Sequence, residues 1–162
     1  MKRLFKYVGI FIFLVLLTGC SVLSVKEETY SLEGHSIKME SGMKKESNSS
    51  FTNYLTGKRY IFTSLKEEFD VVKSVGLTEN SPLIDYTKLV IKNNGMDKKA
   101  IEKDGLTYFT YDSTISGTKY YYMAFTFKTK DAFWLINFAC TYSEKNKYEP
   151  KFKKWAKSIK FD

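Results

Sequence analysis

Hydrophobic and polar residues alternate most regularly in the second half of the chain. Three segments rich in aromatic and β-branched residues cover residues 106–112, 119–128 and 132–140, and short polar stretches separate them. Connections of this length suit hairpin turns, so the pattern predicts an antiparallel meander. A weaker strand is expected just before the meander, over residues 99–103.

The two longest of these strands are apolar on both faces. In the segment 119–128, one face carries Tyr121, Met123, Phe125 and Phe127, and the other carries Tyr120, Tyr122, Ala124 and Thr126. A sheet with one solvated face has polar residues at every second position instead. Both faces therefore need cover, which predicts an α+β fold: an α/β/α sandwich with a central, mainly antiparallel sheet.

Shorter elements are expected in the first half of the chain. Strand-like segments cover residues 35–39, 51–56 and 58–65. Apolar residues at helical spacing predict a helix over residues 65–75, ended by Gly76. A second helix is expected to begin at Pro82 with Ser81 as its N-cap, and Asn93-Asn94-Gly95 would end it.

The last part of the chain predicts an amphipathic helix. Its apolar stripe recurs with the 3.6-residue period of a helix and consists of Tyr148, Phe152, Trp155 and Ile159. Lysines occupy much of the remaining circumference, as is typical of a solvated helix face. If the domain lies close to a membrane, Lys151, Lys154 and Lys157 form a possible contact surface for anionic lipids or wall polymers.

The first twenty residues have the pattern of a secretory signal. Three cationic residues precede an apolar run over residues 7–17, which is too short to span a bilayer as a helix of about 20 residues. Leu17-Thr18-Gly19-Cys20 is similar to the lipobox of bacterial lipoproteins. The resemblance implies that the Cys20 thiol receives a diacylglyceryl group and that cleavage precedes Cys20. The alternatives are an uncleaved anchor and a signal peptide with an incidental cysteine.

These features divide the chain into three parts. Residues 1–19 are the expected signal peptide, residues 20–33 the lipidated cysteine and a tether without periodicity, and residues 34–162 a single domain. With Cys20 alkylated, Cys140 has no partner for a disulfide and is expected to pack as a small hydrophobic residue. The formal net charge is +8, but an exported chain without a recognisable binding module predicts no nucleic-acid partner.

Few residues offer catalytic or metal-binding chemistry. His35 is the only histidine, which leaves no multi-histidine metal site, and we expect it at a strand edge or on the surface. Glu67, Glu68 and Asp70 cluster at the start of a predicted helix, where acids also favour the helix dipole. A calcium site or a pair of catalytic carboxylates there is the alternative. The sequence thus predicts no catalytic residue, no metal and no cofactor.

A cluster of tyrosines suggests a binding surface. Tyr120, Tyr121 and Tyr122 are consecutive, and Tyr108 and Tyr111 lie on the preceding strand. Tyrosine suits interfaces because its ring is apolar and its hydroxyl is polar. Alternation places Tyr121 on the face opposite to its neighbours, so part of the run belongs to the core. Tyr120 and Tyr122 are the candidates for lining a ligand groove.

The order of elements and several phrases resemble the bacterial PsbP-like proteins. The phrases are SIKMESGM in the opening strand, DAFWLINFAC in the meander and FKKWAKSIKF in the last helix. The resemblance covers roughly residues 33–162 and rests on packing residues, chiefly Phe133-Trp134 and Trp155 to Ile159. It implies an α/β/α sandwich and a protein that binds other macromolecules without being an enzyme, and it assigns no binding residue.

Together these patterns predict a lipoprotein anchored through Cys20 to the extracytoplasmic face of a bacterial cell membrane. The leading hypothesis is a non-catalytic binding or accessory module for an envelope protein partner. The alternative is a small-molecule or lipid carrier with a pocket between sheet and helices, and an enzyme comes third. A deep apolar pocket would favour the carrier, and a shallow surface with an exposed apolar patch would favour the binding module.

Overall fold

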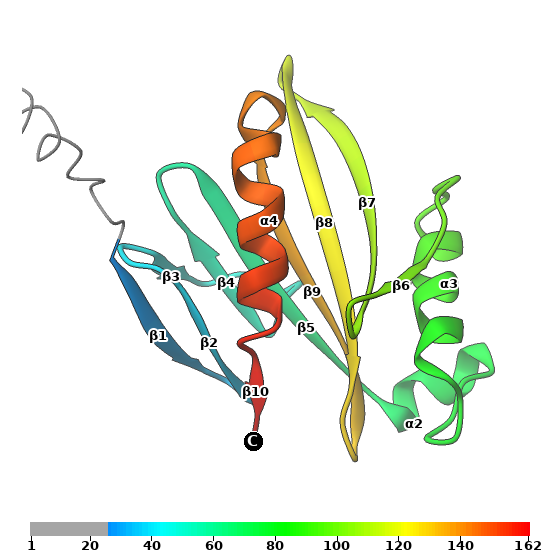
Figure 1. The fold of residues 1–162 in the computed structure, drawn as a ribbon. Helices are drawn as coiled ribbons and strands as arrows, with labels where there is room; N and C mark the ends of the chain where they lie inside the picture. Colours follow the sequence, from blue (N-terminus) through cyan, green and yellow to red (C-terminus); the bar gives the residue numbers. More distant parts are fainter. Residues whose placement is uncertain (1–25) are drawn as a thin grey trace, which may run out of the picture.

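Seven antiparallel strands form the central sheet of the computed structural model, which describes residues 26–162. Their order across the sheet is β3-β4-β5-β9-β8-β7-β6 (Figure 1). The strands are β3 (Lys44–Glu46), β4 (Asn53–Thr56), β5 (Tyr60–Glu68), β6 (Ile101–Lys103), β7 (Leu106–Ile115), β8 (Thr118–Lys128) and β9 (Ala132–Thr141). The predicted meander is confirmed as β7-β8-β9. The predicted signal peptide and Cys20 lie outside the described residues.

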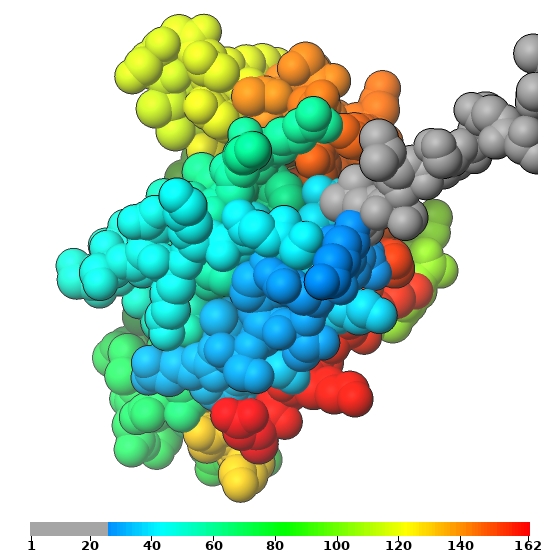
Figure 2. Space-filling model, turned by 90° about the vertical axis from the view of Figure 1, so that its left-hand side faces the viewer, coloured from blue at the N-terminus to red at the C-terminus, as the bar shows by residue number. Residues whose placement is uncertain are grey.

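A second, three-stranded sheet packs beside the large one. It consists of β1 (Glu27–Leu32), β2 (His35–Glu40) and β10 (Lys160–Phe161) in the order β1-β2-β10. Figure 2 shows β1 and β2 in blue across one side of the molecule, with the last residues of the chain in red beside them. Ile37 and Met39 of β2 point into the core and are fully buried.

The prediction of a tether as far as residue 33 is wrong for residues 27–32, which form β1. Strand β1 pairs with β2 along its whole length, from Glu27 opposite Glu40 to Leu32 opposite His35. Its inward face carries only two apolar side chains, Tyr30 and Leu32, which pack against the core. Two apolar positions are too few to predict a strand from the sequence. Because so little apolar surface is buried, the strand is held mainly by pairing with β2.

Helices cover both faces of the large sheet, which confirms the predicted α+β sandwich. On one face, α4 (Lys145–Ala156) packs together with the small sheet, and Tyr148, Phe152 and Trp155 are buried there as predicted. On the other face lie α2 (Phe69–Val72) and α3 (Leu83–Asn93). Within residues 26–162, no helix has both the length and the apolar character needed to cross a membrane.

The helices of the second face differ in detail from the prediction. Strand β5 continues to Glu68, because it stays paired with β9 as far as Ala132, so the helix expected over residues 65–75 is reduced to α2 and a 3-10 turn. Gly76 ends this turn as predicted, at a φ of 86° that favours glycine. Ser81 does not cap α3, since its Oγ accepts the N–H of Thr78 at 2.9 Å.

Candidate functional site

Helix α3 covers only part of its face of the sheet. Phe109, Ala124 and Phe133 are buried beneath α2 and α3, and the Tyr86 ring of α3 stacks on Phe133 at 4.5 Å. Figure 1 shows α3 beside one end of β7, with no helix over the other end of this face. The part that remains uncovered is the candidate site.

The strand register aligns side chains in rows across this uncovered part. One row crosses five strands and consists of Thr56, Ile61, Ala139, Tyr122 and Tyr111. The next row consists of Tyr54, Thr63, Asn137, Ala124 and Phe109, and it passes beneath α3 at Ala124. Most of the side chains in the first row are half-buried, so the row is open to solvent.

These rows form the floor of a hollow of about 210 Å³, which we call the aromatic groove. Its lining residues are Asn48, Phe51, Tyr54, Ile61, Thr63, Tyr111, Tyr122, Asn137 and Ala139. Tyr111 and Tyr122 stack in parallel with their ring centroids 4.6 Å apart. Burial raises the pKa of Tyr111 to about 12 and also raises the pKa of Tyr122, so both phenols stay neutral at physiological pH.

Asn137 is a polar residue within the floor of this groove. Its Oδ1 atom is buried and accepts no hydrogen bond from the described residues. On β9 it lies between Thr63 of β5 and Ala124 of β8, and neither residue donates to its Oδ1. A buried amide oxygen without a donor is energetically costly, which makes Asn137 an unusual polar residue beneath the groove.

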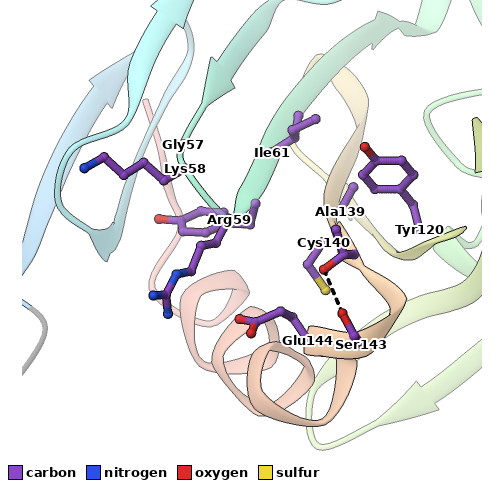
Figure 3. A pocket seen from close by; sticks show the side chains of 11 residues that line it. Gly57, Lys58, Arg59, Ile61, Tyr120, Ala139, Cys140, Ser143 and Glu144 are labelled. Atoms are coloured by element: carbon purple, nitrogen blue, oxygen red, sulfur yellow. Dashed lines mark hydrogen bonds between the residues drawn. The ribbon is translucent and has the colours of Figure 1, made fainter. Parts of the chain in front are cut away.

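A second, larger hollow adjoins the aromatic groove and shares Ile61 and Ala139 with it. This basic hollow has a volume of about 480 Å³ and is named for Lys58 and Arg59, on the turn between β4 and β5 (Figure 3). Ser143 and Glu144, which precede α4, line its other side. Glu144 accepts a hydrogen bond from Lys147 at 3.4 Å.

A third hollow, of about 380 Å³, continues from the same turn toward the end of β2. It shares residues 57–60 with the basic hollow and adds Ser41, Gly42 and Met43. The backbone N–H of Ser41 donates to the carbonyl of Lys26 at 2.9 Å. The three hollows therefore adjoin one another around the turn between β4 and β5, and the third lies near the start of the described chain.

The structure separates the tyrosines that the sequence grouped together. Tyr122 and Tyr111 line the aromatic groove, and Tyr120 lines the basic hollow. Tyr121 and Tyr108 belong to the core on the opposite face, as the alternation predicted for Tyr121. The Tyr121 hydroxyl donates to Glu149 at 3.0 Å.

Most of the other lining residues were not predicted from the sequence. Tyr54, Ile61, Asn137 and Arg59 come from three segments that only the strand register brings together. The available signal was the alternation of β5 and β9, which places Ile61 and Asn137 on the same face as Tyr122. The alternation of the strands could not predict which part of that face α3 covers.

Two of the three lysines predicted as a contact surface are held in ion pairs within the domain. Lys151 bonds to Glu40 of β2, and Lys154 bonds to Glu27 of β1 at 2.8 Å. These pairs join α4 to the small sheet. Lys157 is exposed and makes no ion pair within residues 26–162.

His35 is not at an exposed strand edge, so that prediction is wrong. It lies on β2 and is 1% exposed, because it shares the inward face of the strand with Ile37 and Met39. Its ring contacts Phe62, Trp134 and Phe161. Burial lowers its pKa to about 4.

The remaining chemistry-bearing residues are arranged as structural groups. Cys140 is buried, and burial raises its pKa to about 11, which agrees with the prediction of a packed thiol. Glu67 and Glu68 end strand β5, and the Glu67 carboxylate accepts the Tyr86 hydroxyl. Within residues 26–162, no three side chains among His, Cys, Asp and Glu gather in an arrangement that could hold a metal ion.

Comparison with known proteins gives likenesses in fold. No model of a known family and no curated protein matches the sequence. A solved structure from Bacteroides thetaiotaomicron has a TM-score of 0.51 and 12% identity, covering 85% of this chain. The present chain spans only about half (48%) of that longer protein. Cyanobacterial PsbP (CyanoP) from Synechocystis has a TM-score of 0.49 and 12% identity, covering 89% of this chain and 96% of its own.

A third similar structure is a Pseudomonas aeruginosa protein of unknown function, PA94, with a TM-score of 0.44 and 14% identity over 79% of this chain and 92% of its own. At such identities the likeness concerns the fold and does not extend to a partner, a ligand or a binding residue.

Proposed function

We propose that this protein is a lipoprotein, anchored through Cys20 to the extracytoplasmic face of a bacterial membrane, that binds an envelope protein partner without catalysis. The observation that supports this proposal is the uncovered part of the large sheet, where Tyr111, Tyr122 and Ile61 lie half-exposed in a shallow groove. Apolar surface of this kind on an otherwise charged domain is typical of an interaction site.

The shape of the site favours a protein partner over an enclosed ligand. Small-molecule sites are commonly clefts of about 300 to 1,000 Å³ that bury most of the ligand. The aromatic groove has only about 210 Å³, and the two layers beneath the helices are filled by aromatic side chains. The alternative, a small-molecule or lipid carrier, is supported by the sizes of the basic hollow, about 480 Å³, and of the third hollow, about 380 Å³.

The chemistry of the described residues also agrees better with binding than with catalysis. The histidine and the cysteine that serve most often as base and nucleophile are both buried, with pKa values of about 4 and about 11. Neither lines the aromatic groove, and Cys140 borders the basic hollow only as a buried thiol. The groove instead offers neutral hydroxyl, amide and ring surfaces, which suit recognition.

Site-specific photo-crosslinking in intact cells tests this proposal. A photoreactive phenylalanine analogue replaces Tyr122 in the groove, or Lys92 on the exposed side of α3 as the matched control. We expect a crosslinked protein adduct from position 122 and not from position 92. We expect the Cys20→Ala variant to lose both this adduct and labelling by a palmitate analogue.

Two results would contradict separate parts of the proposal. Equal adducts from positions 122 and 92 would show that the groove has no special role in binding. Persistent palmitate labelling of Cys20→Ala would show that the anchor lies elsewhere.

A further inference from the structure

We infer that the partner segment carries a carboxylate four to six residues from an aromatic or large aliphatic side chain, and that Arg59 binds the carboxylate while the aromatic groove binds the apolar side chain. This inference rests on the proposed binding function and adds the chemistry of the ligand. It follows from three features of the joined hollows: their charge, their dimensions and their hydrogen-bonding groups.

The charge at the basic hollow is unbalanced. Arg59 and Lys58 are exposed, and neither makes an ion pair within residues 26–162. The neighbouring lysines differ, since Lys119 pairs with Asp112 at 2.8 Å, Lys147 with Glu144 and Lys151 with Glu40. The one uncommitted guanidinium at this site can bind a carboxylate through two parallel hydrogen bonds, which a lysine ammonium cannot do.

The dimensions of the two adjoining hollows set the spacing between the two contacts. Arg59 lies two residues before Ile61 on the same chain segment, and Ile61 is separated from Tyr111 by three strand spacings, across β9 and β8 to β7. With about 4.8 Å between strands and about 3.3 Å per residue, the distance is about 16 Å. An extended peptide covers this distance in about five residues.

The hydrogen-bonding groups of the groove suit a peptide better than an acyl chain. Its lining includes three tyrosines, two asparagines and Thr63. Hydroxyl and amide groups both donate and accept, as do the N–H and C=O groups of an extended backbone. An acyl chain would leave the solvent-facing members of this set without partners.

Selection from a random dodecapeptide library tests the inference on the full chain, purified in detergent. We expect enriched peptides to contain Asp or Glu four to six residues from Phe, Tyr, Trp or Leu. Their affinity should fall about fivefold or more in Arg59→Gln, because a charge-assisted hydrogen bond is lost. Lys92→Gln removes one positive charge from the exposed side of α3 and should leave the affinity unchanged.

The outcomes separate this inference from the proposed function. Enriched peptides without an acidic residue, bound equally by Arg59→Gln, would overturn the inference and leave the groove as a peptide site. No enrichment over a folded Tyr122→Ala variant would overturn both. Dodecanoate serves as a probe for the carrier alternative, and binding of dodecanoate without any peptide enrichment would also overturn both.

Discussion

His35 shows how one buried side chain makes the stability of this domain depend on pH. Its ring centroid lies 6.0 Å from that of Phe62, 5.2 Å from Trp134 and 5.8 Å from Phe161. Burial lowers its pKa from the ordinary 6.5 to about 4, against the opposing effects of the Glu33 carbonyl and the Asp162 carboxylate. The imidazole is therefore neutral in the folded protein under conditions where it is half-charged in the unfolded chain.

The direction of the pH dependence follows from this difference. Between pH 6.5 and pH 4 the unfolded chain binds the proton more strongly, so the free energy of unfolding falls as the pH falls. The pKa difference corresponds to about 3 kcal/mol at most over this range. Above about pH 7.5 both states are neutral and His35 contributes no pH dependence.

We predict that His35→Phe removes this part of the pH dependence. Urea unfolding between pH 4.5 and pH 7.5 measures it, because the chain has only one histidine and other groups contribute little near pH 6. The wild-type protein should lose stability over this range, and the variant should lose markedly less. Parallel curves for the two proteins would show that His35 is accessible to protons in the folded state.

Side-chain burial could be predicted from the sequence where residue type and alternation agreed. Cys140 follows an apolar alternation and is buried as expected. His35 occupies the same alternating face as Ile37 and Met39, so its burial was also present in the pattern. Its polar ring favoured the opposite interpretation, since an imidazole buried without a hydrogen-bond partner is uncommon.

Strand β1 is the element for which polar contacts matter most. The Glu27 carboxylate accepts from Lys154 Nζ at 2.8 Å and from Trp155 Nε1 at 3.1 Å, which connects the start of β1 to α4. The hydrogen bond from Lys154 lowers the pKa of Glu27. These contacts join residues more than 120 positions apart, so no local pattern could predict them. The meander and the two longer helices, α3 and α4, by contrast, depend on local periodicity and were predicted.

We predict that a chain beginning at residue 34 is much less stable than one beginning at residue 26. Removal of β1 leaves β2 with an unpaired edge and leaves the buried Trp155 ring without its hydrogen-bond acceptor. We expect the free energy of unfolding to fall by several kcal/mol, or the product to be insoluble. Changes that break a network of buried contacts are among those with the largest effects on stability. Thermal unfolding of the two chains measures the difference. Equal melting temperatures would mean that residues 27–32 act as a tether after all.

At the scale of the whole molecule, element lengths explain why a binding face stays open. Helix α3 has 11 residues, which gives about 16 Å of helix, whereas an 11-residue strand such as β8 extends about 36 Å. One such helix cannot cover the face, and both lengths were close to those predicted from the sequence. What the sequence could not supply was which end α3 covers, because that depends on long-range packing of Tyr86 and Val90 against Phe133 and Phe109.

The same arrangement orients the site relative to the proposed anchor. Lys26 bonds to Ser41, which lines the third hollow together with Lys58 and Arg59. From Cys20 to Lys26 the chain can reach about 20 Å when fully extended. The basic hollow should therefore lie at the membrane-proximal end of the domain. The turn between β8 and β9, which contains Lys130, lies at the opposite end, because β5 pairs with β9 from Tyr60–Cys140 to Glu68–Ala132.

We predict that a dye at position 58 lies closer to the membrane than a dye at position 130. The nine residues of β5 separate the two ends by about 30 Å. In vesicles that contain the lipidated full chain and an acceptor lipid, Lys58→Cys should give clearly stronger energy transfer than Lys130→Cys. Background labelling should be low, because Cys140 is buried and Cys20 is alkylated in the proposed anchor. The control is the same pair of variants in a Cys20→Ala background, which should not bind the vesicles. Equal energy transfer from positions 58 and 130 would contradict this orientation.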